Sequence, residues 1–339
     1  MQLYLKIYLG LSISVISFVG FLNWLVDPLW YGSGNRLSSR NFAFDERVTK
    51  TNHFLQTKRK VDYDCLILGS STATLLRSSS FEQQTCFNYA FSAGRIEEFI
   101  DYASYVKESD IEPSTVYVGV DPGNFSFLVT EFEGTTHIEN RPIYQAYLSW
   151  DAFVLSLRTL FQESPYPRYY DSRQNFEADI IENLPEYNPE FTNTELTQGC
   201  KAEKVMLYDE LQQVFPDATF VGFVPPYSGC VVTNRIYTPG WLDCYLESIH
   251  EVADNFDIFY DFSIPSDTTT RTDNTYDGVH YYPQVYETVA DIMQHEAEDF
   301  GFDVKNSQLA DYQSAYRNAI AEFLEQKGQD EHLASDFEE

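Results

Sequence analysis

A serine that follows a predicted strand is the first candidate for chemistry in this sequence. The apolar run Leu66–Leu68 leads directly into Gly69-Ser70-Ser71, and the residues behind it are compatible with a helix. In an open α/β sheet, ligands bind at the carboxyl ends of the strands, and a helix N-terminus there favours developing negative charge. Ser71 is therefore a candidate nucleophile. Serines also cap helices commonly, so this motif alone leaves both interpretations open.

An aspartate and a histidine three residues apart form the second candidate. Asp277-Gly278-Val279-His280 lies just before the last helix of the predicted α/β region. A turn at Gly278 would direct both side chains toward one spot, where Asp277 orients the imidazole and the other ring nitrogen takes a proton from a serine. A helix N-cap at Asp277 and a metal-ligand pair are the alternatives. No second cluster of His, Asp or Cys residues completes a metal site, so no metal is expected.

The two motifs together predict a catalytic triad of Ser71, Asp277 and His280. Their order along one α/β region indicates more than either motif does alone. The chain has no G-x-S-x-G elbow, which argues against the ordinary α/β-hydrolase fold. It also has neither G-x-G-x-x-G nor a P-loop, so no nucleotide cofactor is expected.

Alternating strand-like and helix-like segments surround these residues. Continuous apolar runs, typical of strands buried on both faces of a parallel sheet, occur at 63–68, 86–91, 115–120, 219–224 and 257–262. Amphipathic stretches predict helices at 95–108, 202–214, 241–255 and 285–300. Such alternation requires right-handed crossovers. The sequence therefore predicts an α/β fold with a doubly wound, mainly parallel five-stranded sheet over residues 61–303.

The stretch 121–200 is too long for an ordinary connection between strands. It contains a predicted helix at 146–161 and an aromatic, proline-rich passage at 164–172. We expect a cap-like insertion beside the active-site end of the sheet, with a surface excursion as the alternative. Beyond the α/β region, residues 304–339 predict an amphipathic helix at 309–325 and a disordered acidic tail.

An uncharged apolar segment stands near the N-terminus. After a short tail at 1–6, residues 7–26 contain no charged side chain, and as a helix these 20 residues rise about 30 Å, the thickness of the hydrocarbon core. The segment ends in bulky residues around Trp24 and lacks the small-residue site of a cleaved signal peptide. We expect an uncleaved transmembrane anchor, followed by a polar, irregular juxtamembrane segment at 27–60. A cleaved signal and a buried core helix are the alternatives.

The charges that flank this segment bear on its orientation. Lys6 and the amino terminus lie on one side, whereas Arg36, Arg40, Arg47 and Lys50 lie on the other. By the positive-inside rule, this count favours a body that stays in the cytoplasm.

The overall charge narrows the range of partners. The chain has 22 Lys and Arg residues against 52 Asp and Glu residues, a formal net charge of −30. A surface that negative repels phosphate backbones, so nucleic acid is not an expected partner. A solvated acidic surface is the simplest interpretation, with a specific cation-binding role as the alternative.

The five cysteines show no metal-type spacing. Cys65 and Cys86 fall in predicted buried strands, where a free cysteine behaves as a small apolar residue. One disulfide among Cys200, Cys230 and Cys244 is compatible with an extracytoplasmic domain. Because the number of cysteines is odd, at least one thiol is left over. Cysteine usage alone does not decide in which compartment the domain lies.

The motifs resemble those of the SGNH (GDSL-like) hydrolase superfamily. The likeness is strongest to its membrane-anchored branch, related to the teichoic-acid D-alanyl transfer protein and the alginate O-acetyltransferases, and it runs over residues 27–292. The segment 66–71 resembles the first family block, with Ser71 at the nucleophile position. The segment 87–94 resembles the second block, which supplies a backbone amide to the oxyanion hole, here from Ala93 or Gly94.

Asp277 and His280 match the final D-x-x-H block of that family, and Val224-Pro-Pro-Tyr227 resembles the end of the fourth strand in the anchored branch. The third block departs from the family pattern. It usually reads Gly-x-Asn, and the asparagine amide is an oxyanion donor. Here the corresponding segment reads Gly-Val-Asp-Pro-Gly-Asn and ends at Asn124. Asn124 is therefore a candidate donor in addition to the backbone amides of Ser71, Ala93 and Gly94, and an ordinary turn residue is the alternative.

The resemblance implies a membrane-anchored serine esterase or O-acyltransferase. It would act on acyl esters of cell-envelope carbohydrate through an acyl-enzyme on Ser71, without a metal or cofactor. It also implies a multi-spanning membrane acyltransferase as a partner and an extracytoplasmic catalytic domain, periplasmic or on the outer face, against the local charge count. A catalytically inactive scaffold of an envelope assembly is the alternative.

Overall fold

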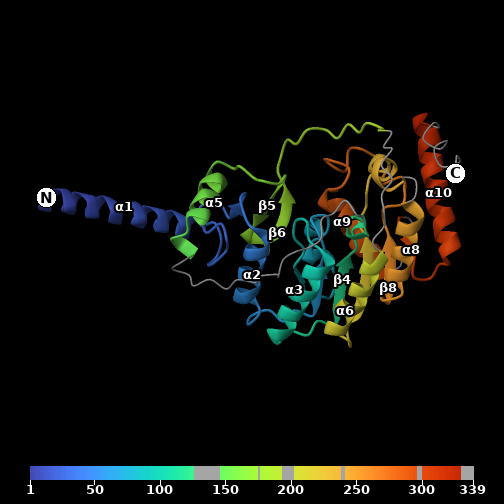
Figure 1. Cartoon of the computed structure of the whole chain (residues 1–339), viewed down its shortest axis with the longest axis horizontal. Coiled ribbons are helices and arrows are strands. Elements are labelled where there is room, and N and C mark those ends of the chain that lie inside the picture. The colour runs from blue at the N-terminus through green and yellow to red at the C-terminus, as the bar shows by residue number, and fades with distance from the viewer. Residues whose placement is uncertain (126–145, 175, 193–201, 238–240, 296–299, 330–339) are drawn as a thin grey trace. The chain divides into compact units, whose positions relative to one another are not determined.

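The chain folds into two compact units in the computed structural model. The structure describes residues 1–125, 146–174, 176–192, 202–237, 241–295 and 300–329 (Figure 1). The first unit comprises Met1–Asp62 and His137–Leu184, and the second comprises Tyr63–Thr136 and Pro185–Glu339. The predicted acidic tail from residue 330 onward lies outside the described residues, as do residues 126–145 and 193–201 of the predicted insertion.

A six-stranded sheet forms the centre of the second unit. Its strands are β2 (Cys65–Leu68), β3 (Cys86–Asn88), β4 (Thr115–Gly119), β7 (Thr219–Val224), β8 (Ile258–Asp261) and β9 (Phe302–Asp303). They lie in the order β3-β2-β4-β7-β8-β9; the first five are parallel, and β9 pairs antiparallel with β8. All five predicted strand segments therefore contain strands of one mainly parallel sheet. The short edge strand β9 was not predicted, because two residues carry no periodic pattern.

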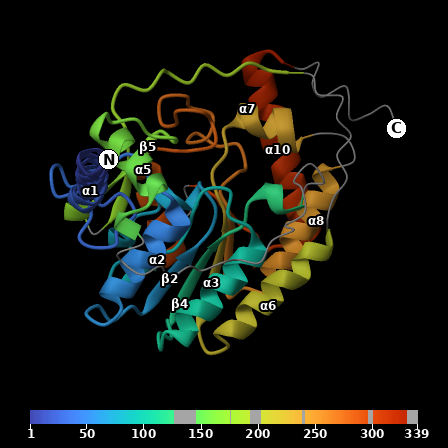
Figure 2. The same ribbon diagram turned by 60° about the vertical axis from the view of Figure 1, so that its left-hand side comes forward.

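Helices flank this sheet. They are α3 (Ile96–Glu108), α6 (Met206–Val214), α7 (Gly229–Val231), α8 (Leu242–Ala253), α9 (Pro283–His295) and α10 (Leu309–Lys327). Short turns of other helix types are η1 (Ala73–Leu75), η2 (Ser78–Ser80), η3 (Pro122–Phe125), η5 (Ala202–Val205) and η6 (Val232–Ile236). Helix α3 packs against α6, and α10 packs against α8 (Figure 2). Helix α9 contacts η2. The predicted helices of the α/β region are thus present, and α9 ends at His295, directly before residues 296–299, which lie outside the described part of the chain.

The strand order creates a switch point at the carboxyl end of the sheet. Counted along the chain, the parallel strands lie in the order 2-1-3-4-5, one of the two common doubly wound arrangements. The connection from β2 leads to β3 on one side, whereas β4 lies on its other side. Ligands of open α/β sheets bind outside the strand ends at such a point. Here those ends are Leu68 and Gly119, directly before the residues that build the candidate site.

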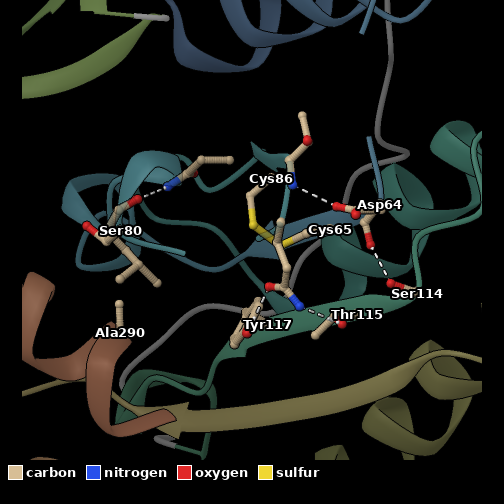
Figure 3. The surroundings of a disulfide bond; sticks show 12 residues. Asp64, Cys65, Ser80, Cys86, Ser114, Thr115, Tyr117 and Ala290 are labelled. Atoms are coloured by element: carbon tan, nitrogen blue, oxygen red, sulfur yellow. Dashed lines mark hydrogen bonds between the residues drawn. A yellow bond between two sulfur atoms is a disulfide. The ribbon is translucent and has the colours of Figure 1, made fainter. Parts of the chain in front are cut away.

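A disulfide joins Cys65 and Cys86 in neighbouring strands (Figure 3). The two residues are direct partners in the parallel register of β2 and β3. The prediction that both are free thiols is therefore wrong, because the spacing along the chain does not reveal which residues face each other across a sheet. Cys244 is disulfide-bonded as well, and Cys230 is a buried free thiol.

Removing the Cys65–Cys86 disulfide is expected to destabilise the second unit by about 3 kcal/mol, because the bond restricts a loop of about 20 residues in the unfolded chain. The sequence separation of the two cysteines is 21. Urea unfolding of the Cys65→Ala/Cys86→Ala double variant, compared with the wild type, measures this loss. An unchanged midpoint would contradict the expectation.

A buried carboxylate ties the C-terminal helix α10 to the sheet. Asp261 ends β8 and is fully buried. Its Oδ2 accepts a hydrogen bond from the Tyr312 hydroxyl at 2.5 Å, and its Oδ1 accepts one from the Ser263 amide at 2.7 Å. Burial raises the pKa of Asp261 to about 6, although the hydrogen bonds from Tyr312 and Ser263 act to lower it.

The stability of the second unit is expected to fall as the pH rises from 3.8 to about 6. A raised pKa means that the folded state holds the proton more tightly than the unfolded state. Asp261 therefore contributes stability that is complete below pH 3.8 and is lost as the pH rises through about 6. Between pH 4 and pH 7 the wild type should lose about 2 kcal/mol more than Asp261→Asn. Urea unfolding of both proteins at the two pH values tests this, and equal losses would contradict it.

The first unit combines a long helix with a small antiparallel sheet. Its helices are α1 (Gln2–Val26), α2 (Glu46–Thr57) and α5 (Trp150–Leu160), and its strands are β1 (Arg40–Asn41), β5 (Arg168–Asp171) and β6 (Glu177–Ile180), with the turn η4 (Ser172–Gln174). The strands lie in the order β1-β5-β6. Helix α1 is long and apolar enough to cross a membrane, and a signal sequence would have the same length and composition. The alternative of a buried core helix is wrong, because only 11% of its apolar window is buried.

Part of the predicted irregular segment 27–60 is helical, which corrects the expectation for residues 46–57. Asp45 caps this helix, α2, by accepting a hydrogen bond from the Val48 amide at 3.3 Å. The buried face of α2 is largely polar and includes Glu46, Thr49 and Lys50. A helix that buries polar side chains has no apolar periodicity, and so the pattern that identified the other helices was missing.

Those polar side chains belong to a buried ionic cluster. Glu46 Oε1 accepts hydrogen bonds from Arg168 Nε at 2.9 Å, from Arg168 Nη2 at 2.8 Å and from the Tyr170 hydroxyl at 2.7 Å. Arg168 and Lys50 are each only 1% exposed. Burial lowers the pKa of Lys50 to about 7; the Glu46 carboxylate opposes this shift, and the Arg168 guanidinium adds to it.

Candidate active site

Ser71, His280 and Asp277 form a continuous chain of hydrogen bonds in the second unit. The distance between His280 Nε2 and Ser71 Oγ is 2.9 Å, and that between His280 Nδ1 and Asp277 Oδ2 is 2.7 Å. Both distances are those of hydrogen bonds, the first between a nucleophile and its base and the second between that base and the group that orients it. The structure thus brings together the three residues of the predicted triad.

A tight turn holds Asp277 and His280 in place. Asp277 Oδ1 accepts hydrogen bonds from the amides of Val279 at 2.9 Å and His280 at 2.8 Å. Gly278 adopts a φ of +80°, and a Cβ atom there would lie 2.3 Å from the Tyr187 hydroxyl. A side chain at this position would therefore be strained and would clash.

The environment of this turn keeps Asp277 ionised. Burial acts to raise the pKa of Asp277, but the hydrogen bonds from the His280 ring and from the His280 and Val279 amides outweigh it, so the pKa lies below its usual value. The Tyr276 ring stacks on the imidazole, with a centroid distance of 5.4 Å and an interplanar angle of 3°. An ionised carboxylate on one ring nitrogen and a stacked ring on one face together fix the orientation of His280.

A second turn approaches the nucleophile from β3. The Phe91 amide donates to the Gly69 carbonyl at 3.1 Å. A Cβ atom at Gly94 would lie 2.9 Å from that same carbonyl, so the absence of a side chain lets the turn pack against the residues before Ser71. Ala93 lies in this turn with a φ of +51°, a conformation that non-glycine residues adopt rarely and often at functional sites.

The predicted oxyanion donors differ in their partners. The Gly94 amide donates to the Phe91 carbonyl at 3.1 Å. The amides of Ser71 and exposed Ala93 make no hydrogen bond within the described part of the chain. Asn124 is buried in η3, and its Nδ2 donates to the Tyr208 hydroxyl at 3.2 Å. Ser71 and Ala93 therefore offer the two amides that are unoccupied by neighbouring described residues, and a role for Asn124 stays a prediction.

An aspartate at the end of β4 belongs to the same region and was not predicted from the sequence. Asp121 Oδ1 accepts hydrogen bonds from the Tyr227 hydroxyl at 2.7 Å and from Thr72 Oγ1 at 3.3 Å. Its Oδ2 is buried and has no partner among the described residues. Burial raises the pKa of Asp121, although the hydrogen bonds from Tyr227, Ser70 and Thr72 and the charge of His280 act to lower it. Asp121 thus braces the turn that carries Ser71.

Part of the predicted insertion reaches the His280 turn. The Tyr187 hydroxyl lies 2.8 Å from Ser228 Oγ, and the Ser228 amide donates to the Gly278 carbonyl at 2.7 Å. Residues 146–184 of the same insertion belong to the first unit. The prediction that they cap the site stays a prediction.

A positional signal for Asp121 was present in the sequence. Asp121 directly follows a predicted strand, as Ser71 nearly does, and the carboxyl ends of parallel strands meet at one edge of the sheet. The stacked Tyr276 adjoins the Asp-x-x-His motif but has no spacing rule of its own. Within the ranges that the structure describes, no group of three His, Cys, Asp or Glu side chains is placed to hold a metal ion.

Comparisons with known proteins add little to this geometry. No family model matches the chain, and no curated protein matches it. Among solved structures, one described as "a putative platelet activating factor from Streptococcus pneumonia" is similar over 94% of this chain and 98% of its own, at 9% identity and a TM-score of 0.35. That degree of similarity supports no argument about fold or function. The inference of function therefore rests on the residues of the site.

Proposed function

We propose that the second unit is a serine-dependent ester hydrolase or O-acyltransferase. The observation that carries the proposal is the hydrogen-bonded series Ser71 Oγ, His280 Nε2, His280 Nδ1 and Asp277 Oδ2. Helix-capping serines do not require a histidine at hydrogen-bond distance that is itself oriented by a carboxylate. That combination is the recurring arrangement of nucleophilic acyl transfer.

The reaction proceeds in two halves. Ser71 Oγ attacks the carbonyl carbon of an ester while His280 Nε2 takes the hydroxyl proton, and Asp277 stabilises the resulting imidazolium. Collapse of the tetrahedral intermediate breaks the bond to the leaving alcohol, which receives the proton from His280. The acyl group then passes from Ser71 to water or to a sugar hydroxyl, with His280 again serving first as base and then as acid.

The developing oxyanion requires hydrogen-bond donors near Ser71. The amides of Ser71 and Ala93 suit this role, since neither has another partner among the described residues. Removing one donor of this kind in other enzymes reduces the rate by about 10²–10³. A role of the Ala93 amide as an oxyanion donor would explain why this residue adopts a strained, left-handed conformation.

We further propose that α1 is retained as an anchor and that the body is extracytoplasmic. Leu22, Asn23 and Val26 at the end of α1 are buried within the first unit. The Asp27 carboxylate accepts hydrogen bonds from the amides of Tyr31, Gly32 and Gly34. Cleavage in this region would remove part of a packed structure, which supports retention. The disulfides at Cys65–Cys86 and Cys244 favour an oxidising compartment.

Carbohydrate of the cell envelope is the substrate class that we propose. A tethered enzyme outside the cytoplasm meets acyl esters of envelope polysaccharide, and the SGNH resemblance implies the same chemistry. A multi-spanning membrane acyltransferase is the proposed partner that would supply acyl groups. The formal charge of −30 disfavours polyanionic acceptors.

The experiment that tests the function offers the purified full chain p-nitrophenyl acetate, with and without an oligosaccharide acceptor. Hydrolysis without acceptor indicates an esterase, and acetylated oligosaccharide detected by mass spectrometry indicates a transferase. Ser71→Ala should abolish both products. A folded chain that gives neither product with this or longer acyl esters would favour the inactive scaffold instead.

A further inference from the structure

Helix α5 (Trp150–Leu160) exposes large apolar side chains at both of its ends, beside the exposed charged residues Asp151 and Arg158. Its buried residues are small or polar, namely Ala152, Ser156 and Thr159. By contrast, Trp150 is 68% exposed, Leu160 is 41% exposed, and the adjoining Phe161 is 74% exposed. A helix on a water-facing surface shows the opposite distribution. The exposed face of α5 is therefore suited to an apolar environment.

Contacts within the first unit fix α5 against the last turns of α1. The rings of Phe18 and Phe153 meet edge to face with centroids 6.5 Å apart. A Cβ atom at Gly20 would lie 3.2 Å from Leu148 Cδ2, so the glycine allows a close approach. Figure 1 shows α5 beside the C-terminal end of α1.

A polar side chain completes this contact. Asn23 is fully buried; its Nδ2 donates to the carbonyls of Tyr147 at 2.8 Å and Ser149 at 3.1 Å, and its Oδ1 accepts from Ser156 Oγ at 3.0 Å. Small residues at the contact and polar side chains bonded across it are the features by which helices associate in lipid. The α1–α5 contact thus has the composition of a membrane helix pair.

The position of these contacts along α1 sets the depth of α5. With a rise of 1.5 Å per residue, Phe18 lies about 12 Å and Asn23 about 5 Å before the end of the apolar segment at Val26. If that segment fills the hydrocarbon core, its C-terminal half lies in one leaflet of the bilayer, and α5 lies in the outer part of that leaflet. Interfacial helices bury their apolar face about 5–10 Å into the boundary between headgroups and acyl chains. At 11 residues, α5 is too short to span the bilayer.

We infer that α5 is an interfacial helix that inserts Trp150 and Leu160, together with the adjoining Leu148 and Phe161, into the lipid bilayer beside the anchor α1. This rests on the proposed retention of α1. The occupant is lipid because these side chains adjoin the exposed apolar residues of α1, which meet this segment where Phe18 contacts Phe153 and Gly20 faces Leu148. The first unit would therefore contact the bilayer through both α1 and α5, and α1 could not rotate freely about its own axis in the membrane.

Tryptophan fluorescence in vesicles tests this inference with the full chain. The protein has four tryptophans: Trp24, Trp30, Trp150 and Trp241. Trp30 and Trp241 are each 3% exposed and serve as an internal background. The chain, Trp150→Phe and Trp24→Phe are each reconstituted into phosphatidylcholine vesicles, with and without bromine on the acyl chains, which quenches tryptophan in contact with lipid.

Trp150→Phe is expected to lose about as much quenchable emission as Trp24→Phe. If Trp24→Phe loses quenchable emission and Trp150→Phe does not, α1 is in lipid and α5 is not, which overturns the inference but leaves the anchor. A second copy or another part of the protein covering Trp150 would give this same result. If lipid quenches neither position, retention of α1 as an anchor fails, and the inference fails with it.

Discussion

Ser71→Ala is expected to lower kcat/KM for a short acyl ester by at least about 10³-fold, because the acyl-enzyme can no longer form. His280→Ala should lower it by a similar factor. The double variant should be no slower than either single variant, since the nucleophile and its base act as a unit. The measurement is the steady-state rate of p-nitrophenyl acetate hydrolysis after subtraction of the rate without enzyme.

Two further variants separate the triad from its surroundings. Asp277→Asn should reduce the rate less than Ser71→Ala does, because Asp277 orients His280 and its side chain is 42% exposed to water. Ser70→Ala is the matched control: it is the adjacent serine, and its Oγ lies 3.3 Å from Thr72 Oγ1. Ser70→Ala should remain active. Loss of activity in Ser70→Ala with a fully active Ser71→Ala would place the nucleophile one residue earlier.

Arg168→Met is expected to lower the free energy of unfolding of the first unit by about 3–5 kcal/mol. The substitution leaves the Glu46 carboxylate buried without the guanidinium that gives it two hydrogen bonds, and an uncompensated buried charge is strongly destabilising. The nearby Lys50 ammonium offsets part of the loss. Chemical denaturation followed by circular dichroism measures it.

Two comparisons show whether the buried charge is the cause. Arg173→Met removes an arginine whose side chain is 67% exposed and pairs with Asp171 at 3.2 Å, so it should destabilise the first unit far less than Arg168→Met does. Glu46→Gln/Arg168→Met removes both charges and should recover a large part of the lost stability. If the double variant loses as much stability as Glu46→Gln and Arg168→Met lose separately when their losses are added, the ion pair is not the source of the effect.

The parallel sheet could be predicted because its strands are buried on both faces. The runs at Cys65–Leu68 and 220–224 are apolar and buried throughout, and such runs between amphipathic helices have few other interpretations. Helix α2 could not be predicted in this way, since Glu46 and Lys50 face the interior and are stabilised by partners from β5. Those partners lie more than a hundred residues away along the chain.

The candidate site likewise contains some residues that could be predicted from the sequence and others that could not. Ser71 and the Asp277–His280 pair have residue types and spacing that indicate a chemical role before any fold is known. Tyr276 and Asp121 act through position, one by stacking on His280 and the other by accepting hydrogen bonds from Thr72 and Tyr227. Tyr276 lies four residues before His280, but the stacking of the two rings follows no spacing rule. The partners of Asp121 come from distant segments, 49 and 106 residues away along the chain, and no single segment shows that the fold brings them together. The Cys65–Cys86 disulfide was missed for this reason too.

The central claim is that Ser71 is a nucleophile activated by His280, and labelling with a fluorophosphonate probe tests it most directly. The probe phosphonylates activated serines and leaves ordinary hydroxyls unmodified. We expect the folded wild type to gain one adduct, which peptide mass spectrometry locates at Ser71. We also expect Ser71→Ala and His280→Ala to remain unlabelled, and Ser70→Ala to label as the wild type does. A folded wild-type protein that never labels, or an adduct that persists in Ser71→Ala, would contradict the claim.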